Sequence, residues 1–185
     1  MNIDCNIDGK NYSFSTNSDK PLLQILIEDL EVESMMSLCK GAYCGNCVVL
    51  MDGQAVLSCL VPAFKLQGAV IQTFESFKKT RAYRDIDRAY KEIGCTPCRQ
   101  CYASKTLIIE SVIQTLERSQ STLSNPMEFN RVRRESDMEG IRTEEEKLII
   151  RELGLNSCTC TQSSELVKIV TTCIDYRRKR NVRRS

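Results

Sequence analysis

The sequence predicts an α+β fold in which a small β-sheet with one helix is followed by a bundle of helices. Residues 1–77 hold segments of alternating polarity around two Asp-Gly turns, the pattern of β-hairpins. Residues 78–185 hold charged segments with apolar residues three or four positions apart, the pattern of amphipathic helices. Each part also contains closely spaced cysteines. We therefore expect two domains, 1–77 and 78–185, each with its own cysteine site.

The first part has the element order of a β-grasp fold, in which a sheet wraps around one helix. The dipeptides Asp8-Gly9 and Asp52-Gly53 favour tight hairpins. The helix between the hairpins has Ser18 or Asp19 as its expected N-cap and Pro21 near its first position. The expected elements are a helix that ends at Leu30 and the strands Asn2–Ile7, Asn11–Ser15, Val48–Met51, Gln54–Leu57 and Ala69–Phe74.

The second part is expected to be a four-helix bundle, because each of four segments has one apolar face. Thr143 and Glu146 form a capping-box pattern at the start of the third. A polar stretch near residues 119–140 has no periodicity and is interpreted as a surface loop. The expected helices are Lys79–Ile93, Tyr102–Leu116, Thr143–Leu153 and Ser163–Arg177.

The first cysteine set has the spacing C-x4-C-x2-C-x11-C, which matches the plant-type [2Fe–2S] pattern. Gly41 and Gly45 would let the loop curl so that backbone N–H groups face the cluster sulfides. Zinc would favour paired C-x2-C knuckles, and buried structural thiols would not need this spacing. The sequence therefore predicts a first [2Fe–2S] cluster. Its expected ligands are Cys39, Cys44, Cys47 and Cys59.

The second cysteine set pairs C-x2-C with C-x-C, each just before an expected helix. A helix N-terminus carries partial positive charge, which suits an anionic cluster. The spacing alone leaves three interpretations open: a [2Fe–2S] cluster, a zinc site, or structural thiols. The set consists of Cys98, Cys101, Cys158 and Cys160.

The remaining cysteines are interpreted separately. Cys95 precedes Cys98 by three positions, so a C-x2-C-x2-C run could instead hold a [4Fe–4S] centre with a remote fourth ligand. The alternative is that Cys95 is a spare thiol beside the site. Cys5 and Cys173 lie within apolar strand and helix patterns and are expected to be buried small hydrophobes.

Composition excludes several classes of protein. The chain has no histidine, which excludes Cys2His2 zinc sites, Rieske centres and His-based acid–base catalysis. It has no GxGxxG or Walker loop, so we expect no FAD, NAD or ATP site on this chain. No apolar run approaches the ~18 residues of a membrane span, and the N-terminus does not resemble a signal peptide. A cytoplasmic location is expected, where such cysteines bind metal more often than they form disulfides.

Charge gives no evidence for a nucleic-acid or membrane partner. The net charge is +2, so the chain as a whole has no strong field. The segment Tyr176–Ser185 is rich in arginine and lysine but has one aromatic residue. It is interpreted as a solvated basic tail.

The segment Cys39–Leu60, CKGAYCGNCVVLMDGQAVLSCL, resembles the signature of the [2Fe–2S] subunit of the molybdenum hydroxylases. This family includes xanthine dehydrogenase, aldehyde oxidoreductase and aerobic carbon monoxide dehydrogenase. Thr73-Phe74-Glu75 is similar to a Thr-x-Glu motif of the family, and the order of the two cysteine sets is typical of it. The resemblance implies a ferredoxin-like first domain. It also implies that Cys98, Cys101, Cys158 and Cys160 hold a second [2Fe–2S] cluster.

The resemblance implies that this chain transfers electrons and has no substrate site of its own. Electrons would come from a molybdopterin-binding large subunit that hydroxylates a purine or an aldehyde. They would pass through the helical-domain cluster and then the ferredoxin-domain cluster to FAD on a medium subunit. One alternative is a stand-alone ferredoxin-like carrier for another reductase. A second is a zinc-stabilised interaction module.

The chain departs from the family pattern at several positions. Ala42 stands where the family usually has glycine, and Gly41 precedes it. Pro97 replaces the glutamine that contacts the molybdopterin in relatives, which favours the stand-alone carrier. The usual CRCTGY is replaced by the sequence Cys158–Ser163, CTCTQS, and the segment between the two cysteine pairs is longer than in relatives. These changes leave the expected ligands intact.

Overall fold

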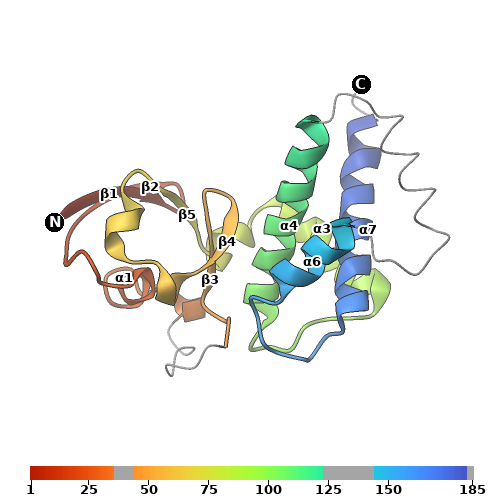
Figure 1. Cartoon of the computed structure of the whole chain (residues 1–185), viewed down its shortest axis with the longest axis horizontal. Coiled ribbons are helices and arrows are strands. Elements are labelled where there is room, and N and C mark those ends of the chain that lie inside the picture. Colours follow the sequence, from red (N-terminus) through yellow and green to blue (C-terminus); the bar gives the residue numbers. More distant parts are fainter. Residues whose placement is uncertain (36–43, 123–143, 183–185) are drawn as a thin grey trace.

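The computed structural model describes residues 1–35, 44–122 and 144–182. All its strands lie in the first part of the chain and its long helices in the second (Figure 1), which confirms the expected mixed α and β content. The strands are β1 (Asn2–Ile7), β2 (Lys10–Ser15), β3 (Val48–Met51), β4 (Gln54–Leu57) and β5 (Val70–Gln72). The helices are α1 (Leu22–Glu28), α2 (Phe74–Phe77), α3 (Arg81–Ile93), α4 (Tyr102–Thr122), α6 (Glu144–Leu153) and α7 (Ser163–Val182). The short 3₁₀ turns are η1 (Glu33–Met35), η2 (Ser58–Leu60) and η3 (Ala63–Leu66).

The five strands form one sheet in the order β2-β1-β5-β3-β4. Only the β1–β5 pair is parallel among the strand pairs described. Both predicted hairpin turns are found. Asp8 and Asp52 have φ angles of 54° and 52°, and the glycine after each also has a positive φ. Two successive residues at positive φ fit the twist of a tight hairpin, which explains the Asp-Gly pairs.

Strand β3 is buried on both faces, so it joins two hydrophobic clusters. Val49 packs with Leu26 and other residues of α1 beneath the sheet. Val48 and Leu50 point the other way and pack with the helices of the second part. Successive side chains of a strand alternate between faces, which places one strand in both clusters. The backbone N–H of Ala55 on β4 also donates to Ser111 Oγ on α4 at 2.8 Å.

Helices α3, α4, α6 and α7 pack against one another, as Figure 1 shows. Their shared cluster is apolar, with Ile108, Val112 and Ile169 completely or almost completely buried. Thr80 caps α3 by accepting a hydrogen bond from the N–H of Tyr83. Each of the four predicted helices is therefore present, with shifted ends. No helix of the described segments has the length and apolar character needed to span a membrane.

The start of α1 differs from the prediction. Neither Ser18 nor Asp19 caps it, because the helix begins directly after Pro21, without a side-chain cap. Pro21 forms an isolated β-bridge with Pro62, which keeps the chain extended up to the first helical residue. The helix also ends at Glu28 rather than at the expected Leu30.

The last strand is shorter than the predicted Ala69–Phe74, because β5 ends at Gln72 and Phe74 begins α2. Thr73 lies between the two. Its N–H and hydroxyl both donate to the Asp8 carboxylate, at 2.8 and 2.7 Å. These bonds replace the strand pairing and turn the chain out of the sheet.

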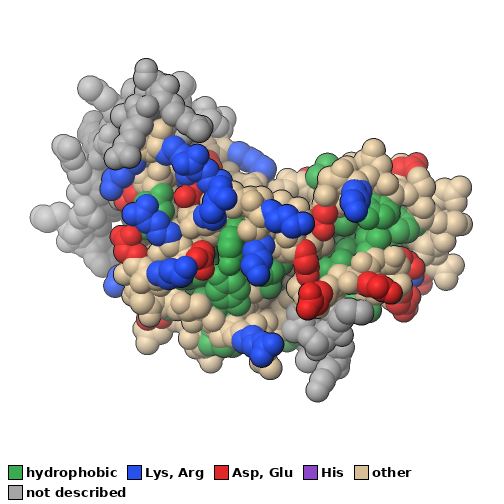
Figure 2. All heavy atoms as spheres, turned by 180° about the vertical axis from the view of Figure 1, so that it is seen from behind, with side chains coloured by type: hydrophobic (Ala, Val, Ile, Leu, Met, Phe, Trp, Pro, Cys, Tyr) green, Lys and Arg blue, Asp and Glu red, His purple; other side chains and the backbone are tan. Residues whose placement is uncertain are grey.

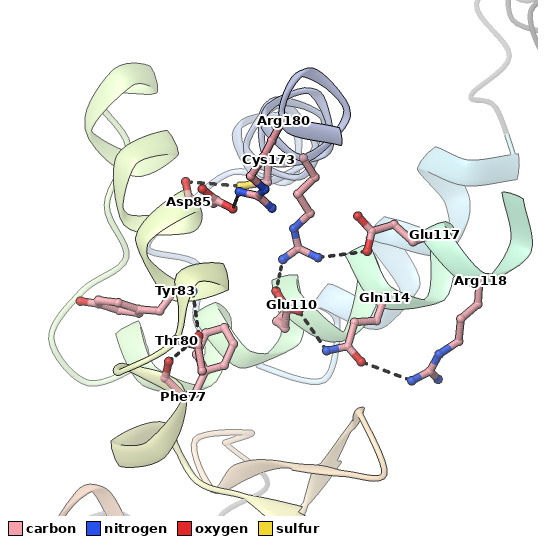
Figure 3. Close-up of polar contacts among 11 residues, drawn as sticks. Phe77, Thr80, Tyr83, Asp85, Glu110, Gln114, Glu117, Arg118, Cys173 and Arg180 are labelled. Atoms are coloured by element: carbon pink, nitrogen blue, oxygen red, sulfur yellow. Dashed lines mark hydrogen bonds and ion pairs between the residues drawn. The ribbon is translucent and has the colours of Figure 1, made fainter. Parts of the chain in front are cut away.

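The basic C-terminal segment is helical as far as Val182, so the prediction of a solvated tail is wrong there. On α7, Arg177 pairs with Glu110 and Glu117 of α4. Arg180 of the same helix pairs with Asp85 of α3 at 2.8 Å (Figure 3). Other Lys and Arg side chains gather over the same helical part when it is seen from behind (Figure 2).

The predicted polar loop begins later than expected, because α4 continues to Thr122. The rest of that loop, and the expected N-cap Thr143, lie outside the described residues.

Candidate metal centre

The two halves of the second cysteine set meet in space. The Sγ atoms of its four members lie within 4.8 Å of one another. Cys98 Sγ is 3.2 Å from Cys101 Sγ and 3.8 Å from Cys158 Sγ. Cys101 Sγ is 3.0 Å from Cys160 Sγ. Residues about 60 positions apart thus converge on one point, and none of the four is in a disulfide.

The first pair of this set is positioned by the start of α4. The N–H groups of Cys101 and Tyr102 both donate to the carbonyl of Cys98, at 3.1 and 2.9 Å. This turn leads directly into the helix, so the partly positive helix N-terminus lies beside the thiols, as the sequence indicated. The N–H of Cys98 donates across the site to Cys160 Sγ at 3.3 Å.

The thiols of the set have strongly different acidities. Burial opposes ionisation of Cys160, but the N–H of Cys98 and the neighbouring thiols lower the pKa of Cys160 to about 6. Burial, followed by the neighbouring sulfurs, raises the pKa of Cys101. Metal binding requires deprotonated thiols, and the hydrogen bond from the Cys98 N–H favours the thiolate of Cys160.

Lys105 is a residue of this site that the sequence reasoning did not single out. Its ammonium donates to the carbonyl of Cys158 at 2.8 Å and to Thr161 Oγ1 at 2.6 Å. It also lies 3.8 Å from Cys160 Sγ. The sequence did contain a signal for this role. Lys105 lies in the first turn of the helix expected from Tyr102, just before its apolar face begins.

Cys95 lies near the four thiols but is not part of their group. Its Sγ donates to the carboxylate of Glu165 at 3.1 Å. Burial and then Glu165 raise the pKa of Cys95 to about 11. This arrangement is the one expected of a spare thiol. The other two separate cysteines, Cys5 and Cys173, are buried in the strand and helix cores as predicted.

The first cysteine set is only partly described. Cys39 and Gly41 lie outside the described residues. Cys44 and Cys47 lie in the loop that leads into β3, and Cys59 lies in η2 just after β4. Cys47 and Cys59 are at the same end of one hairpin, where Ser58 donates twice to the carbonyl of Cys47. Cys44, Cys47 and Cys59 form no sulfur group comparable to the second set within the residues described.

Gly45 joins the first cysteine loop to the second site. Its φ is +73°, and a Cβ placed on it would lie 1.9 Å from the carbonyl oxygen of Leu155. A side chain at this position would therefore meet backbone. The sequence reasoning assigned Gly45 to curling of the first loop. The structure adds a close approach by the segment that carries Cys158.

Asn156 completes this junction and was also missed from sequence. Its amide donates to the Gly45 carbonyl at 3.0 Å, to Asn46 Oδ1 at 2.8 Å and to Ser104 Oγ at 2.9 Å. Its Oδ1 accepts from the N–H of Cys158 at 3.0 Å. One side chain thus contacts the loops of both cysteine sets. No sequence pattern around Asn156 indicates this role.

The Thr-x-Glu motif contacts the 3₁₀ turn η1 through Glu75. The carboxylate of Glu75 accepts from the N–H of Ser34 at 2.7 Å and from its hydroxyl at 3.0 Å. Ser34 belongs to η1, which leads into the segment that contains Cys39. Burial alone would raise the pKa of Glu75, but these bonds outweigh it and lower that pKa below 4.5.

The chain was compared with known proteins. No protein-family model matches it. It is 26% identical over 177 residues to a subunit of nicotinate dehydrogenase from Pseudomonas putida, over 96% of this chain and 97% of that protein. It is 25% identical over 173 residues to the xanthine dehydrogenase iron-sulfur-binding subunit of Escherichia coli O157:H7, over 94% of each. Its fold is similar to that of quinoline 2-oxidoreductase from Pseudomonas putida 86, with a TM-score of 0.66, 20% identity, and coverage of 97% of this chain and 96% of that chain.

Proposed function

We propose that this chain, a relative of the iron–sulfur subunits of molybdenum hydroxylases, is a cytoplasmic electron carrier with two [2Fe–2S] clusters. The resemblance predicted from Cys39–Leu60 is confirmed by the similarity to dehydrogenase subunits over almost the whole chain. The chain is accordingly part of an oxidoreductase, and we assign it no substrate site of its own. Residues 1–77 and 78–185 would each carry one cluster.

The convergence of Cys98, Cys101, Cys158 and Cys160 carries this proposal. Four cysteine sulfurs and no nearby histidine suit iron–sulfur ligation, because Cys thiolates are the usual ligands of such clusters. The N–H of Cys98 already points at one sulfur, and hydrogen bonds to sulfur tune cluster potentials. The first cluster would be held by Cys39, Cys44, Cys47 and Cys59, as their spacing predicts.

Each [2Fe–2S] cluster, when bound, supplies a centre that accepts and releases one electron. The chain's own part is to hold the thiolates and to keep the two cysteine loops in contact through Gly45 and Asn156. We propose that electrons arrive from a molybdopterin-binding large subunit whose substrate is a purine or an aldehyde. They would leave towards FAD on a medium subunit.

A zinc site is the second candidate for the second set, and one observation favours it. Four thiolates at a zinc–sulfur distance of about 2.3 Å lie about 3.8 Å apart. Three of the sulfur separations are 3.0–3.8 Å and all four sulfurs lie within 4.8 Å of one another, which approaches that compact arrangement. A two-iron cluster needs a wider set, so the thiols would have to move outward to hold it.

The deciding experiment is the iron, sulfide and zinc content of anaerobically purified chain, with low-temperature EPR after dithionite reduction. We expect about four irons and four sulfides, and two distinct S = 1/2 signals. Cys47→Ser should remove only the first signal and Cys101→Ser only the second. Zinc in place of the second pair of irons would overturn the two-cluster proposal.

The stand-alone carrier remains the alternative to a complex, because Pro97 replaces the usual pterin-contacting glutamine. Purification of the native chain from its own cells separates the two. Co-purification with large molybdenum-binding and flavin-binding partners supports the complex. A chain that carries both clusters and arrives alone supports the free carrier.

A further inference from the structure

Lys105 is a buried cation beside the second cysteine set. Its side chain lies on the first turn of α4 and the residue is 2% exposed. Within the part of the chain that the structure describes, the ammonium forms no ion pair with Asp or Glu. Its partners are the neutral Cys158 carbonyl and Thr161 hydroxyl, with Cys160 Sγ at 3.8 Å.

An arrangement of this kind is costly unless an anion lies close by. An ammonium loses strong hydration when it is buried, and two neutral acceptors recover only part of this loss. The anions available to Lys105 are the thiolates of the second cysteine set. Four thiolates with two ferric ions and two sulfides carry a net charge of −2, which becomes −3 when one electron is added.

We propose that Lys105 is a positioning charge for the second cysteine set, where it stabilises the reduced state of the bound cluster and so raises its reduction potential. The inference rests on the proposed function. The attraction between the ammonium and the cluster grows when the electron arrives, because the negative charge increases by one. Burial keeps this attraction strong, since water screens little of it.

Arg99 provides a matched control within the same site. It lies between Cys98 and Cys101, so it is a positive charge close to the same thiols, but it is exposed. Solvent screening should make its effect on the cluster small. The comparison therefore separates a buried charge from a charge that is merely nearby.

The test is an anaerobic redox titration of the full chain, with the two EPR signals followed separately. Lys105→Met keeps the length and apolar stem of the side chain and removes its charge. We expect it to lower the reduced-to-oxidised ratio of the second cluster about tenfold at a fixed potential, which is 59 mV for a one-electron couple. The first cluster should keep its potential, and Arg99→Gln should shift the second by much less.

An unchanged second potential in Lys105→Met overturns the inference, and so does an equal shift in Arg99→Gln. If Lys105→Met fails to assemble the second cluster while the first remains, the deciding variant is Lys105→Arg, which keeps the positive charge. Recovery of the second signal by this charged side chain supports the inference, and equal loss in both variants overturns it. A second signal that is missing from the unmodified chain overturns the proposed function itself, which distinguishes the two failures.

Discussion

The side-chain amide of Asn156 donates a hydrogen bond to the backbone carbonyl of Gly45 at 3.0 Å, although the two residues are 111 positions apart. Gly45 belongs to the first cysteine loop, and Asn156 lies two residues before Cys158. The hydroxyl of Ser157 adds a bond to the Cys44 carbonyl at 3.2 Å. The segments that carry the two cysteine sets are therefore joined by hydrogen bonds from side chains of one to backbone carbonyls of the other.

Replacing Asn156 by alanine should loosen this junction. The variant loses the amide's bonds to three acceptors and leaves buried polar groups without their partner, so we expect a loss of about 2–4 kcal/mol in the free energy of unfolding. Anaerobic urea denaturation measures it. Asn11→Ala is the control, because Asn11 is exposed and its side chain accepts one bond, from Asn6. Equal losses in the two variants would contradict the role of the junction.

Alanine at Gly45 should be far more harmful than alanine at Gly68. Both glycines have a φ of +73°, so both substitutions bear the same cost of a left-handed backbone, about 1–2 kcal/mol. A Cβ on Gly68 meets nothing within 4 Å, whereas one on Gly45 would lie 1.9 Å from Leu155 O. The difference between the two variants in thermal unfolding measures the clash alone. If they were equally stable, the close approach of Leu155 would be wrong.

Glu75 should stabilise the first cysteine loop through Ser34. Glu75→Gln weakens two charge-assisted hydrogen bonds, so we expect a loss of about 1 kcal/mol in the free energy of unfolding. We also expect faster release of iron from the first cluster to a chelator. Glu33→Gln, an exposed change within the same 3₁₀ turn, should do neither. A slower or unchanged release in Glu75→Gln would argue against this support.

The pH dependence of that loss follows from the lowered pKa of Glu75. A carboxyl whose pKa is lower in the folded than in the unfolded state stabilises the fold fully above its unfolded value of 4.5. The contribution disappears only as the pH falls through the folded value. The difference between Glu75→Gln and the parent chain should therefore be constant between about pH 5.5 and 7.5. Urea denaturation at several pH values in this range measures it.

Cys95→Ser should leave both clusters in place. The Cys95 thiol bonds to Glu165 and stays outside the group of four sulfurs, and serine can make the same bond. The EPR spectrum of the reduced variant should match that of the parent chain. Loss of the second signal would instead favour the three-cysteine run as the site. Cys101→Ser, which should lose that signal, is the positive control.

Local pattern predicted much of this chain. Asp8-Gly9 and Asp52-Gly53 located both hairpins, since positive φ at two successive positions admits few residues. Apolar periodicity located all four long helices, because a buried face must repeat with the helical turn. The ends of the helices were less predictable than their positions. Pro21 bridges Pro62, and Arg177 finds acidic partners on another helix, so distant residues decide where α1 begins and how far α7 continues.

The residue types available for the chemistry are evident without any structure: cysteines at cluster-like spacing, no histidine, and glycine within the first loop. Folding then brings Cys98 to Cys158, Leu155 to Gly45, and Lys105 into an enclosed place beside the thiols. The spacing of the cysteines and the family resemblance had already grouped Cys98 with Cys158, but the contacts of Gly45 and Lys105 could not be predicted from local pattern. The physical reason is the distance along the chain over which each kind of signal acts. Spacing and periodicity act over a few residues, whereas a shared site, a steric contact and a buried charge depend on segments that packing brings together.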